Sequence, residues 1–407
     1  MTSVSLQQTA PASRFSRDER ERRYGAVRAA MRARRIDCLL IPHHTGEWDN
    51  YQADGRYLTC IGGGGAATAV VFPLEGEPIA AIREERRIGW WRDQQDWISD
   101  IRAPKAFSWA GVFKDVISER KLDRASIGIV GLKDVLRDAE GTAAFGEIEA
   151  LKETFPHAAF SSATDLMGLV RKRKSAEEVK VMQQAQACAD AMSDALRRSA
   201  KPGEPEHAIY ASVTASYIEA GGEMPTMILF NADPQMWQTH LMPRFRHVTS
   251  DDVVVLEAEA KFFGYIAQSI ETIPLRHLSP AEARLFEVSK CCFDALIDAM
   301  KPGVAYADLI GLWEKTAAGK THKAGRTMGH GIGQGQDVPL TTRGGKAAGL
   351  VVEEGDCFVL KPWVEDDAGT ISVRFGANVV VGARGASTLA AAHPSATKKT
   401  IRIGAHR

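Results

Sequence analysis

Two segments of the chain repeat the same order of apolar and polar positions. Each has a periodic apolar stretch, a Lys-Pro-Gly turn and a second periodic stretch, and they begin at Asp194 and Asp294. Apolar residues that recur every three to four positions predict amphipathic helices, and a Pro-Gly pair ends a helix. Strand-like runs follow each pair: VVVLEAEAKFFGYIAQSIETI after the first, CFVLKPWVEDD and TISVRFGANVVV after the second. The pattern predicts two similar halves in which helices back a curved antiparallel sheet.

The region before the repeat follows another pattern. RDERERRYGAVRAAMRARRIDCLLI predicts a helix that runs into a strand, and YLTCIGGGGAATAVVFPLEGEPIAAI predicts two strands around a glycine turn. Helix and strand signals alternate to about residue 165, and Ser175 with Glu178 then has the spacing of a capping box that opens a long helix. We expect a disordered tail over residues 1–14, an α/β domain over 15–170 and a second domain over 171–407.

Composition narrows the classes of partner. The chain has 51 Lys and Arg residues against 51 Asp and Glu residues, so no excess of positive charge attracts phosphate backbones or anionic lipid. We therefore expect neither nucleic acid nor a membrane as partner. The six cysteines form no CxxC pair, which favours free thiols over a zinc site or a disulfide framework. The first residues contain no apolar leader, so a cytoplasmic location is expected.

Several motifs in order resemble one known family. They are the KSAEE helix start, both KPG turns, THLMP, LEAEAKFFGY, GHGIG, EEGDCFVLKP and SVRFGANVVV. From Lys172 to about residue 395 the chain resembles the creatinase/aminopeptidase P superfamily, which has the pita-bread fold. The resemblance implies an α+β protein: a creatinase-like N-terminal α/β domain, then a pseudo-twofold pita-bread domain whose curved antiparallel sheet is backed by helices. It also implies a homodimer.

Metallopeptidases of that family bind two divalent metals through two Asp, one His and two Glu. The matching positions here hold other residues, except for the histidine: they are Glu257, Gln268, His330, Lys361 and Gly376. A dinuclear centre uses carboxylates to offset the charge of the two ions and to bridge them. An ammonium group cannot accept a coordinate bond, and glycine offers no side chain. We therefore expect no metal and no other cofactor.

Two histidines are candidates for proton transfer. By resemblance, His240 matches a catalytic histidine that metal-free creatinases place before the first ligand strand, and His330 is a histidine that they retain. A neutral imidazole can move a proton in either direction near pH 7. His330 would donate or accept a hydrogen bond with the substrate or leaving group. The alternatives are a hydrogen-bonded loop histidine at 240 and a space-filling one at 330.

The remaining candidates surround the first ligand position. Glu257 and Glu259 are two residues apart on an apolar strand, so both side chains lie on one face. Two such carboxylates need a cation, for which Lys361 is the first candidate and Arg374 the second. Glu257 could orient His240, attack as a nucleophile or only form an ion pair. Gln268 can bind a carboxylate or an amide of the substrate. Glu259 and Arg374 are further candidates for binding polar groups of the substrate.

These residues lead to a main hypothesis and two alternatives. The main one is a metal-independent hydrolase or lyase of a small non-peptide molecule that cleaves a C–N bond, with His240, Glu257, His330 and Lys361 as catalytic residues. The first alternative is a catalytically dead pita-bread module that only binds. The second is a metal-dependent Xaa-Pro aminopeptidase or dipeptidase.

Overall fold

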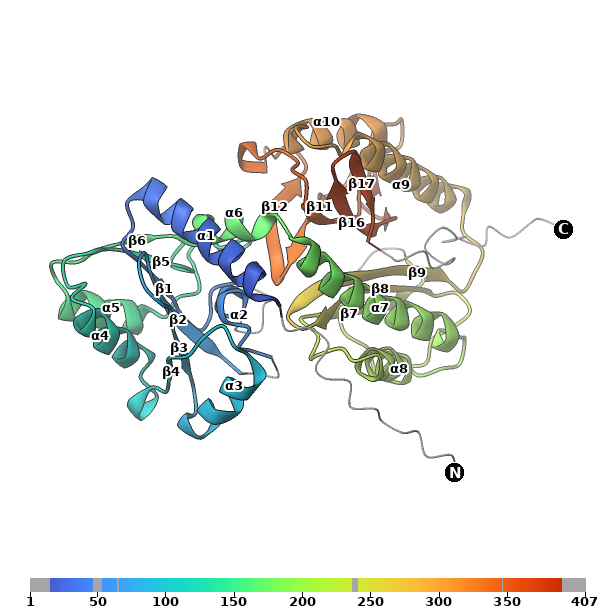
Figure 1. Ribbon diagram of the computed structural model, residues 1–407. Coiled ribbons are helices and arrows are strands. Elements are labelled where there is room, and N and C mark those ends of the chain that lie inside the picture. Colours follow the sequence, from blue (N-terminus) through green and yellow to red (C-terminus); the bar gives the residue numbers. More distant parts are fainter. Residues whose placement is uncertain (1–14, 47–52, 64–65, 236–240, 346, 390–407) are drawn as a thin grey trace, which may run out of the picture.

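The computed structural model describes residues 15–46, 53–63, 66–235, 241–345 and 347–389. The tail predicted to be disordered, residues 1–14, lies outside these ranges. Figure 1 shows an N-terminal part at the left and a C-terminal part at the right, joined through α6 (Thr164–Lys172) and the start of α7 (Ala176–Ser199). None of the helices in the described ranges combines the length and the hydropathy that a membrane span requires.

The N-terminal part is built on one six-stranded sheet with the order β4-β3-β2-β1-β5-β6. The strands are β1 (Cys38–Ile41), β2 (Thr68–Pro73), β3 (Ile79–Ile82), β4 (Ile101–Arg102), β5 (Ser126–Ile129) and β6 (Ala159–Ser162). The helices are α1 (Arg17–Arg34), α2 (Ala53–Thr59), α3 (Ile88–Gln94), α4 (Trp109–Glu119), α5 (Phe145–Thr154) and α6. The central strand β1 is buried on both faces: Leu39 joins one apolar cluster with α1, and Leu40 joins another with α4. Alternation along the strand thus gives the sheet a core on each side.

One predicted strand is wrong. Residues Tyr57–Thr59, expected to open a strand, end the helix α2, and the two strands of that region are β2 and β3. A short apolar run cannot be assigned to strand or helix by periodicity alone. Here Gly55 lets the helix lie directly on β2, because a Cβ at that position would stand 2.5 Å from the Thr68 carbonyl oxygen.

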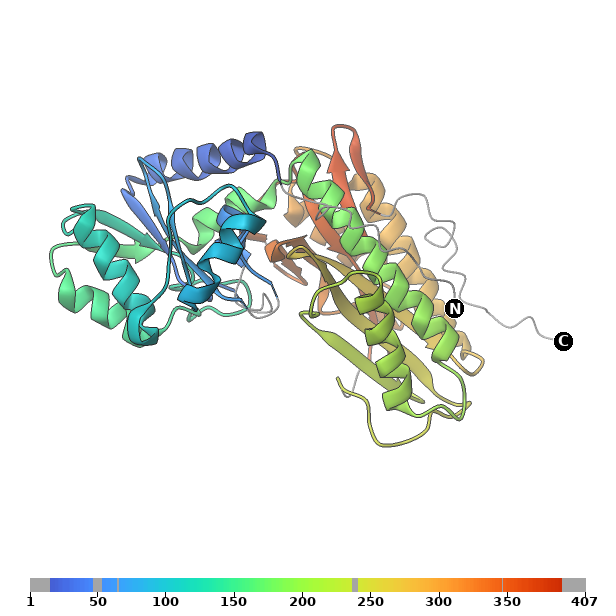
Figure 2. The ribbon, with the colours of Figure 1, turned by 60° about the horizontal axis from the view of Figure 1, so that its bottom comes forward.

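The C-terminal part repeats a helix pair followed by strands, as the sequence predicts. The first half contains α7, α8 (Glu206–Glu219), β7 (Ile228–Asp233), β8 (Val253–Phe262) and β9 (Tyr265–Pro274). The second contains α9 (Pro280–Ala299), α10 (Tyr306–Ala317), β10 (His322–Ala324), β11 (Thr327–Gly333), β12 (Gly335–Thr342), β13 (Cys357–Leu360), β14 (Trp363–Asp366), β15 (Ser372–Arg374), β16 (Ala377–Gly382) and β17 (Gly385–Thr388). Both long helices begin with a full capping box, Ser175 with Glu178 and Ser279 with Glu282. Figure 2 shows α7 and α9 on the same side of the strands. The α+β pita-bread prediction is confirmed.

The two halves form separate hydrogen-bonded sheets, and Asn378 links the backbone of one to the other. The sheet orders are β7-β8-β9 in the first half, and β12-β11-β13-β16-β17 and β10-β14-β15 in the second. The Asn378 carboxamide on β16 accepts from the Gln268 backbone N–H at 3.0 Å and donates to the Gln268 carbonyl at 2.8 Å. The Asn378 side chain thus makes the two hydrogen bonds to the Gln268 N–H and C=O that a neighbouring strand would otherwise make. These bonds hold Gln268 between the two halves.

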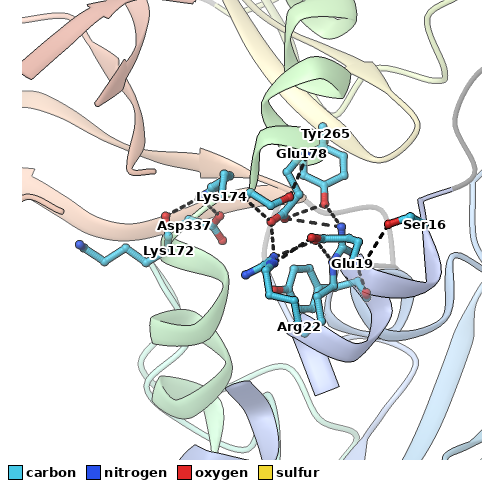
Figure 3. A network of polar contacts seen from close by, with 11 residues as sticks. Ser16, Glu19, Arg22, Lys172, Lys174, Glu178, Tyr265 and Asp337 are labelled. Carbon is cyan, nitrogen blue, oxygen red and sulfur yellow. Dashed lines mark hydrogen bonds and ion pairs between the residues drawn. The ribbon is translucent and has the colours of Figure 1, made fainter. Parts of the chain in front are cut away.

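Buried charges hold the N-terminal part against the start of α7 (Figure 3). Glu178 receives hydrogen bonds from Arg22 of α1 at 2.6 Å and from Tyr265 of β9 at 2.8 Å. Lys174 donates to Asp337 of β12 at 2.7 Å. The domain boundaries stay predictions; their support is that the six-stranded sheet uses only strands before residue 163 and the other sheets only strands after residue 227.

Candidate functional site

Strand β8 presents two acidic side chains on one face of the sheet. Glu257 and Glu259 both lie inside the strand and are buried, at 6% and 0% exposure. Both side chains lie on one face, because Lys361 bonds to Glu257 and to Gln268, and Gln268 bonds to Glu259. Burial removes water from both carboxylates, so neighbouring donors decide whether each stays ionised.

Two cations hold Glu257. The Lys361 ammonium donates to Glu257 Oε1, and the Arg374 guanidinium meets Glu257 Oε2 at 2.8 Å. Burial alone would raise the pKa of Glu257, but the charges of Arg374 and Lys361 outweigh it and lower that pKa to about 2. Burial also lowers the pKa of Lys361, although Glu257 opposes this effect. Both cations that the sequence proposes for this carboxylate therefore contact it, one on each oxygen.

Gln268 connects the two acids to the histidine. Its Oε1 accepts from Lys361 Nζ at 2.7 Å, and its Nε2 donates to Glu259 Oε1 at 2.8 Å. The same Nε2 lies 3.2 Å from His330 Nε2. An ammonium group can only donate, so the amide oxygen must face Lys361 and the NH₂ group must face Glu259 and His330.

That orientation fixes the protonation of His330. Its Nε2 has to accept from Gln268, so the ring proton lies on Nδ1, which donates to the Gly331 carbonyl at 2.9 Å. The ring is fully buried, and burial followed by the charge of Lys361 lowers the pKa of His330 well below its ordinary value. At neutral pH the imidazole is uncharged.

Glu259 lies in a different environment from Glu257. Its Oε1 accepts from Gln268 and, at 2.9 Å, from Gln336 Nε2 of β12, both of which are neutral amides. Its Oε2 is buried and has no hydrogen-bond partner among the described residues. Burial raises the pKa of Glu259, and the hydrogen bond from Gln268 and the charge of Lys361 only partly oppose it.

The other predicted residues fall in three places. His240 lies outside the described residues, so the structure does not place it near Glu257. Arg374 lies over the Trp363 ring at 4.6 Å, which makes Trp363 a support for that cation. Glu271 points to the opposite face, where it pairs with Arg197 at 2.7 Å beside a cavity of about 80 Å³ next to α7.

Gly376, which stands at the last ligand position of the family, has no room for a side chain. A Cβ there would lie 2.6 Å from the Leu360 carbonyl oxygen and 2.7 Å from the Lys361 Cβ. The backbone after β15 has therefore closed onto the lysine-bearing segment.

Sequence reasoning missed two residues of this network. By the family resemblance, Gln336 stands at a position where the peptidases usually carry a histidine. This departure from the family pattern is the sequence signal that could have indicated Gln336. Asn378 has no such signal, because its role depends on the distance between two sheets that pattern analysis cannot give.

The residues present do not fit a pair of divalent metals. Lys361 places a positive charge directly on the carboxylate that would bind an ion, and Gln268 directs its NH₂ group towards His330 Nε2. In the described ranges, no group of three or more His, Cys, Asp or Glu side chains could hold a metal ion. Repulsion by the ammonium group and the use of the imidazole lone pair by an N–H donor both oppose coordination.

Comparison with solved structures identifies the fold. The structure is similar to a prolidase from Thermococcus sibiricus, with a TM-score of 0.75 over 93% of this chain and 98% of the other, at 17% identity. A Xaa-Pro dipeptidase from Bacillus anthracis gives a TM-score of 0.74 over 92% of this chain and 98% of the other, also at 17% identity. The protein thus has the same fold as these peptidases, which confirms the predicted pita-bread fold.

Sequence comparison then gives the family. The metallopeptidase family M24 matches residues 180–383, half of the chain. The chain belongs to this family of hydrolases. A Xaa-Pro dipeptidase from Lactobacillus helveticus is 26% identical over 220 residues, which are 53% of this chain and 59% of that protein. An uncharacterised hydrolase/peptidase from Sinorhizobium fredii is 23% identical over 383 residues, 88% of this chain and 91% of that protein. The chain thus matches less than two thirds of the Lactobacillus relative and most of the Sinorhizobium one.

The comparisons overturn the main functional hypothesis. The hypothesis of a hydrolase or lyase that cleaves a C–N bond of a small non-peptide molecule is wrong, because the relatives are named Xaa-Pro dipeptidases. They agree better with the second alternative, a metal-dependent Xaa-Pro aminopeptidase or dipeptidase. The error has a physical origin: the loss of ligand residues bears on the metal, and it carries no information about the bond that is cleaved.

Proposed function

We propose that this chain is a hydrolase of short peptides, with Xaa-Pro dipeptides as its first substrate class. Family membership and the names of the relatives support the reaction and the substrate class. The site supports it through one observation: two cations, Lys361 and Arg374, converge on one ionised carboxylate. Glu257 contacts both cations, whereas the second carboxylate, Glu259, is held by two neutral amides. Such a site favours the free carboxylate of a dipeptide.

We further propose that this site works without metal ions. Lys361 and Arg374 contact the two oxygens of Glu257, and Lys361 also reaches Gln268 Oε1. Fixed cations in a buried site can polarise a carbonyl group and stabilise negative charge that develops on it. His330 stays neutral, and a substrate would have to replace Gln268 or Gly331 as its hydrogen-bond partner. Glu257, His330 and Lys361 are the proposed catalytic residues, with Gln268, Glu259 and Arg374 as substrate-binding residues.

Release of proline from Gly-Pro and Ala-Pro tests both parts of the proposal. We expect release in the presence of EDTA, and loss of most of it in Lys361→Met. Lys361→Arg, which keeps the charge, separates loss of activity from loss of folding, and the exposed Lys290→Met is the matched control. Release only after Mn²⁺ or Co²⁺ is added would disprove the metal-free part and leave the substrate class intact.

A second candidate function is dipeptide binding without turnover. The specific observation that favours it is the closed network, in which Glu257, Lys361 and Gln268 satisfy one another and are each less than 10% exposed. Calorimetry with Gly-Pro in the same buffers separates the two candidates. Binding without proline release supports this second function; neither binding nor release overturns both.

Assembly and location stay proposals. We propose a homodimer, as the family resemblance suggests, and we also propose a cytoplasmic location. Sedimentation equilibrium measures the first: a mass near the 44.3 kDa of one chain would contradict it.

A further inference from the structure

A residue of the N-terminal part contacts the candidate site from outside. Arg137 lies in the connection between β5 and α5, with a left-handed φ of 71°. Its Nε donates to Gln336 Oε1 on β12 at 2.7 Å, although the two residues are 199 positions apart. Non-glycine residues rarely adopt that backbone conformation; the Arg137 side chain itself is exposed.

The contact continues directly to Glu259. A guanidinium group only donates, so the oxygen of the Gln336 amide must face Arg137 and the NH₂ group must face the other way. That NH₂ group donates to Glu259 Oε1 at 2.9 Å. Without Arg137, the amide could turn over, and its oxygen would then face a carboxylate oxygen.

Glu259 is therefore oriented from two sides. Lys361 fixes the direction of the Gln268 amide at one end, and Arg137 fixes that of Gln336 at the other. Both amides donate to the same oxygen, Glu259 Oε1. The second oxygen, Oε2, is left buried without a hydrogen-bond partner in the part of the chain that the structure describes.

We propose that Arg137 is a positioning residue of the candidate site: through Gln336 it fixes the direction of the Glu259 carboxylate, so that Oε1 is occupied and Oε2 remains available to a donor group of the substrate. The N-terminal domain thus completes the site within one chain. The role in substrate binding rests on the proposed function, whereas the hydrogen-bond relay does not.

The relay is tested without substrate by NMR of the glutamine side-chain amides. With ¹⁵N-labelled glutamine, and with Gln336→Met and Gln268→Met for assignment, we expect the Nε2 protons of Gln336 to exchange slowly in the native protein. Arg137→Met should speed that exchange about tenfold or more, because the amide loses its fixed partner. Arg137→Lys, which keeps a donor, should retain part of the protection. Arg124→Met removes an exposed arginine of the same domain and should change nothing.

Dipeptide binding provides the second readout. We expect Arg137→Met to weaken Gly-Pro binding about tenfold in the native background and to have no further effect in Gln336→Met. An equal loss in both backgrounds would mean that the Arg137 charge acts through space and would overturn the relay. Unchanged amide exchange in Arg137→Met would also overturn it. If the native protein binds no dipeptide, the proposed function fails, and the exchange experiment still decides the relay.

Discussion

The two halves of the C-terminal part have similar folds but opposite charge at the point where they meet. The first half supplies Glu257, Glu259 and Gln268 from the hairpin β8–β9. The second supplies Lys361 after β13 and Arg374 on β15. A dinuclear site would need acids from both halves around shared ions, whereas here acid on one side meets base on the other. The comparison teaches that direct ion pairs between side chains can join the two halves at the position where shared metal ions would join them in a dinuclear site.

The substitution of Lys361 should have the largest effect on this contact. Lys361→Met leaves Glu257 buried with Arg374 alone and removes the donor to Gln268 Oε1. Loss of one partner from a buried ion pair costs about 3–5 kcal/mol of the free energy of unfolding. Urea denaturation at pH 7 measures it. The exposed pair Lys290–Asp294 gives the control, because Lys290→Met should cost less than about 0.5 kcal/mol. Equal losses in the two variants would contradict the ion-paired contact.

Acid should weaken the same contact. The pKa of Glu257 is lowered from 4.5 to about 2 in the folded protein, so its ion pairs stabilise the fold fully above about pH 4.5. That stability is lost as the pH falls from about 4.5 towards 2. The size is about 3 kcal/mol. Denaturation curves at pH 2.5, 4 and 6 should show this slope in the native protein and a shallower one in Glu257→Gln. Parallel curves for the two proteins would refute the prediction.

The asparagine link between the halves should matter less. Asn378→Ala removes the acceptor and the donor that satisfy the backbone of Gln268, which leaves buried polar groups unpaired. We expect a loss of about 1–3 kcal/mol in the free energy of unfolding. Thermal denaturation at pH 7 is sufficient, and an unchanged melting temperature in Asn378→Ala would argue against the link.

The smallest effect should have the opposite sign. Burial raises the pKa of Glu259, so ionisation of this residue costs stability as the pH rises above its ordinary value of 4.5. Glu259→Gln removes that cost and keeps an oxygen for the two amide donors. The free energy of unfolding of the variant should rise relative to that of the native protein as the pH increases from 5 to 8. A gain at pH 8 that does not exceed the gain at pH 5 would show that Glu259 is not the titrating group.

The sequence predicts the fold and much of the site for identifiable reasons. The repeated helix and strand pattern predicts the two halves, and strand alternation places Glu257 and Glu259 on one face. The need of buried acids for a cation leads to Lys361 and Arg374. Arg137 and Asn378 could not be found in this way, because their partners are defined only by how domains and sheets pack. The Tyr57 segment was assigned to a strand because a short buried run has the same composition in either structure.

The crowding at Gly376 restricts how this chain could change. The Leu360 carbonyl and the Lys361 Cβ occupy the space that any side chain at 376 would need. Restoring an acid at 361 alone would still leave the carbonyl in the way, so the backbone would have to separate before an acid could return at 376. Acids at both 361 and 376 therefore require a different course of the backbone around Gly376. Engineers who want to build a metal centre here should redesign this segment before they exchange any ligand.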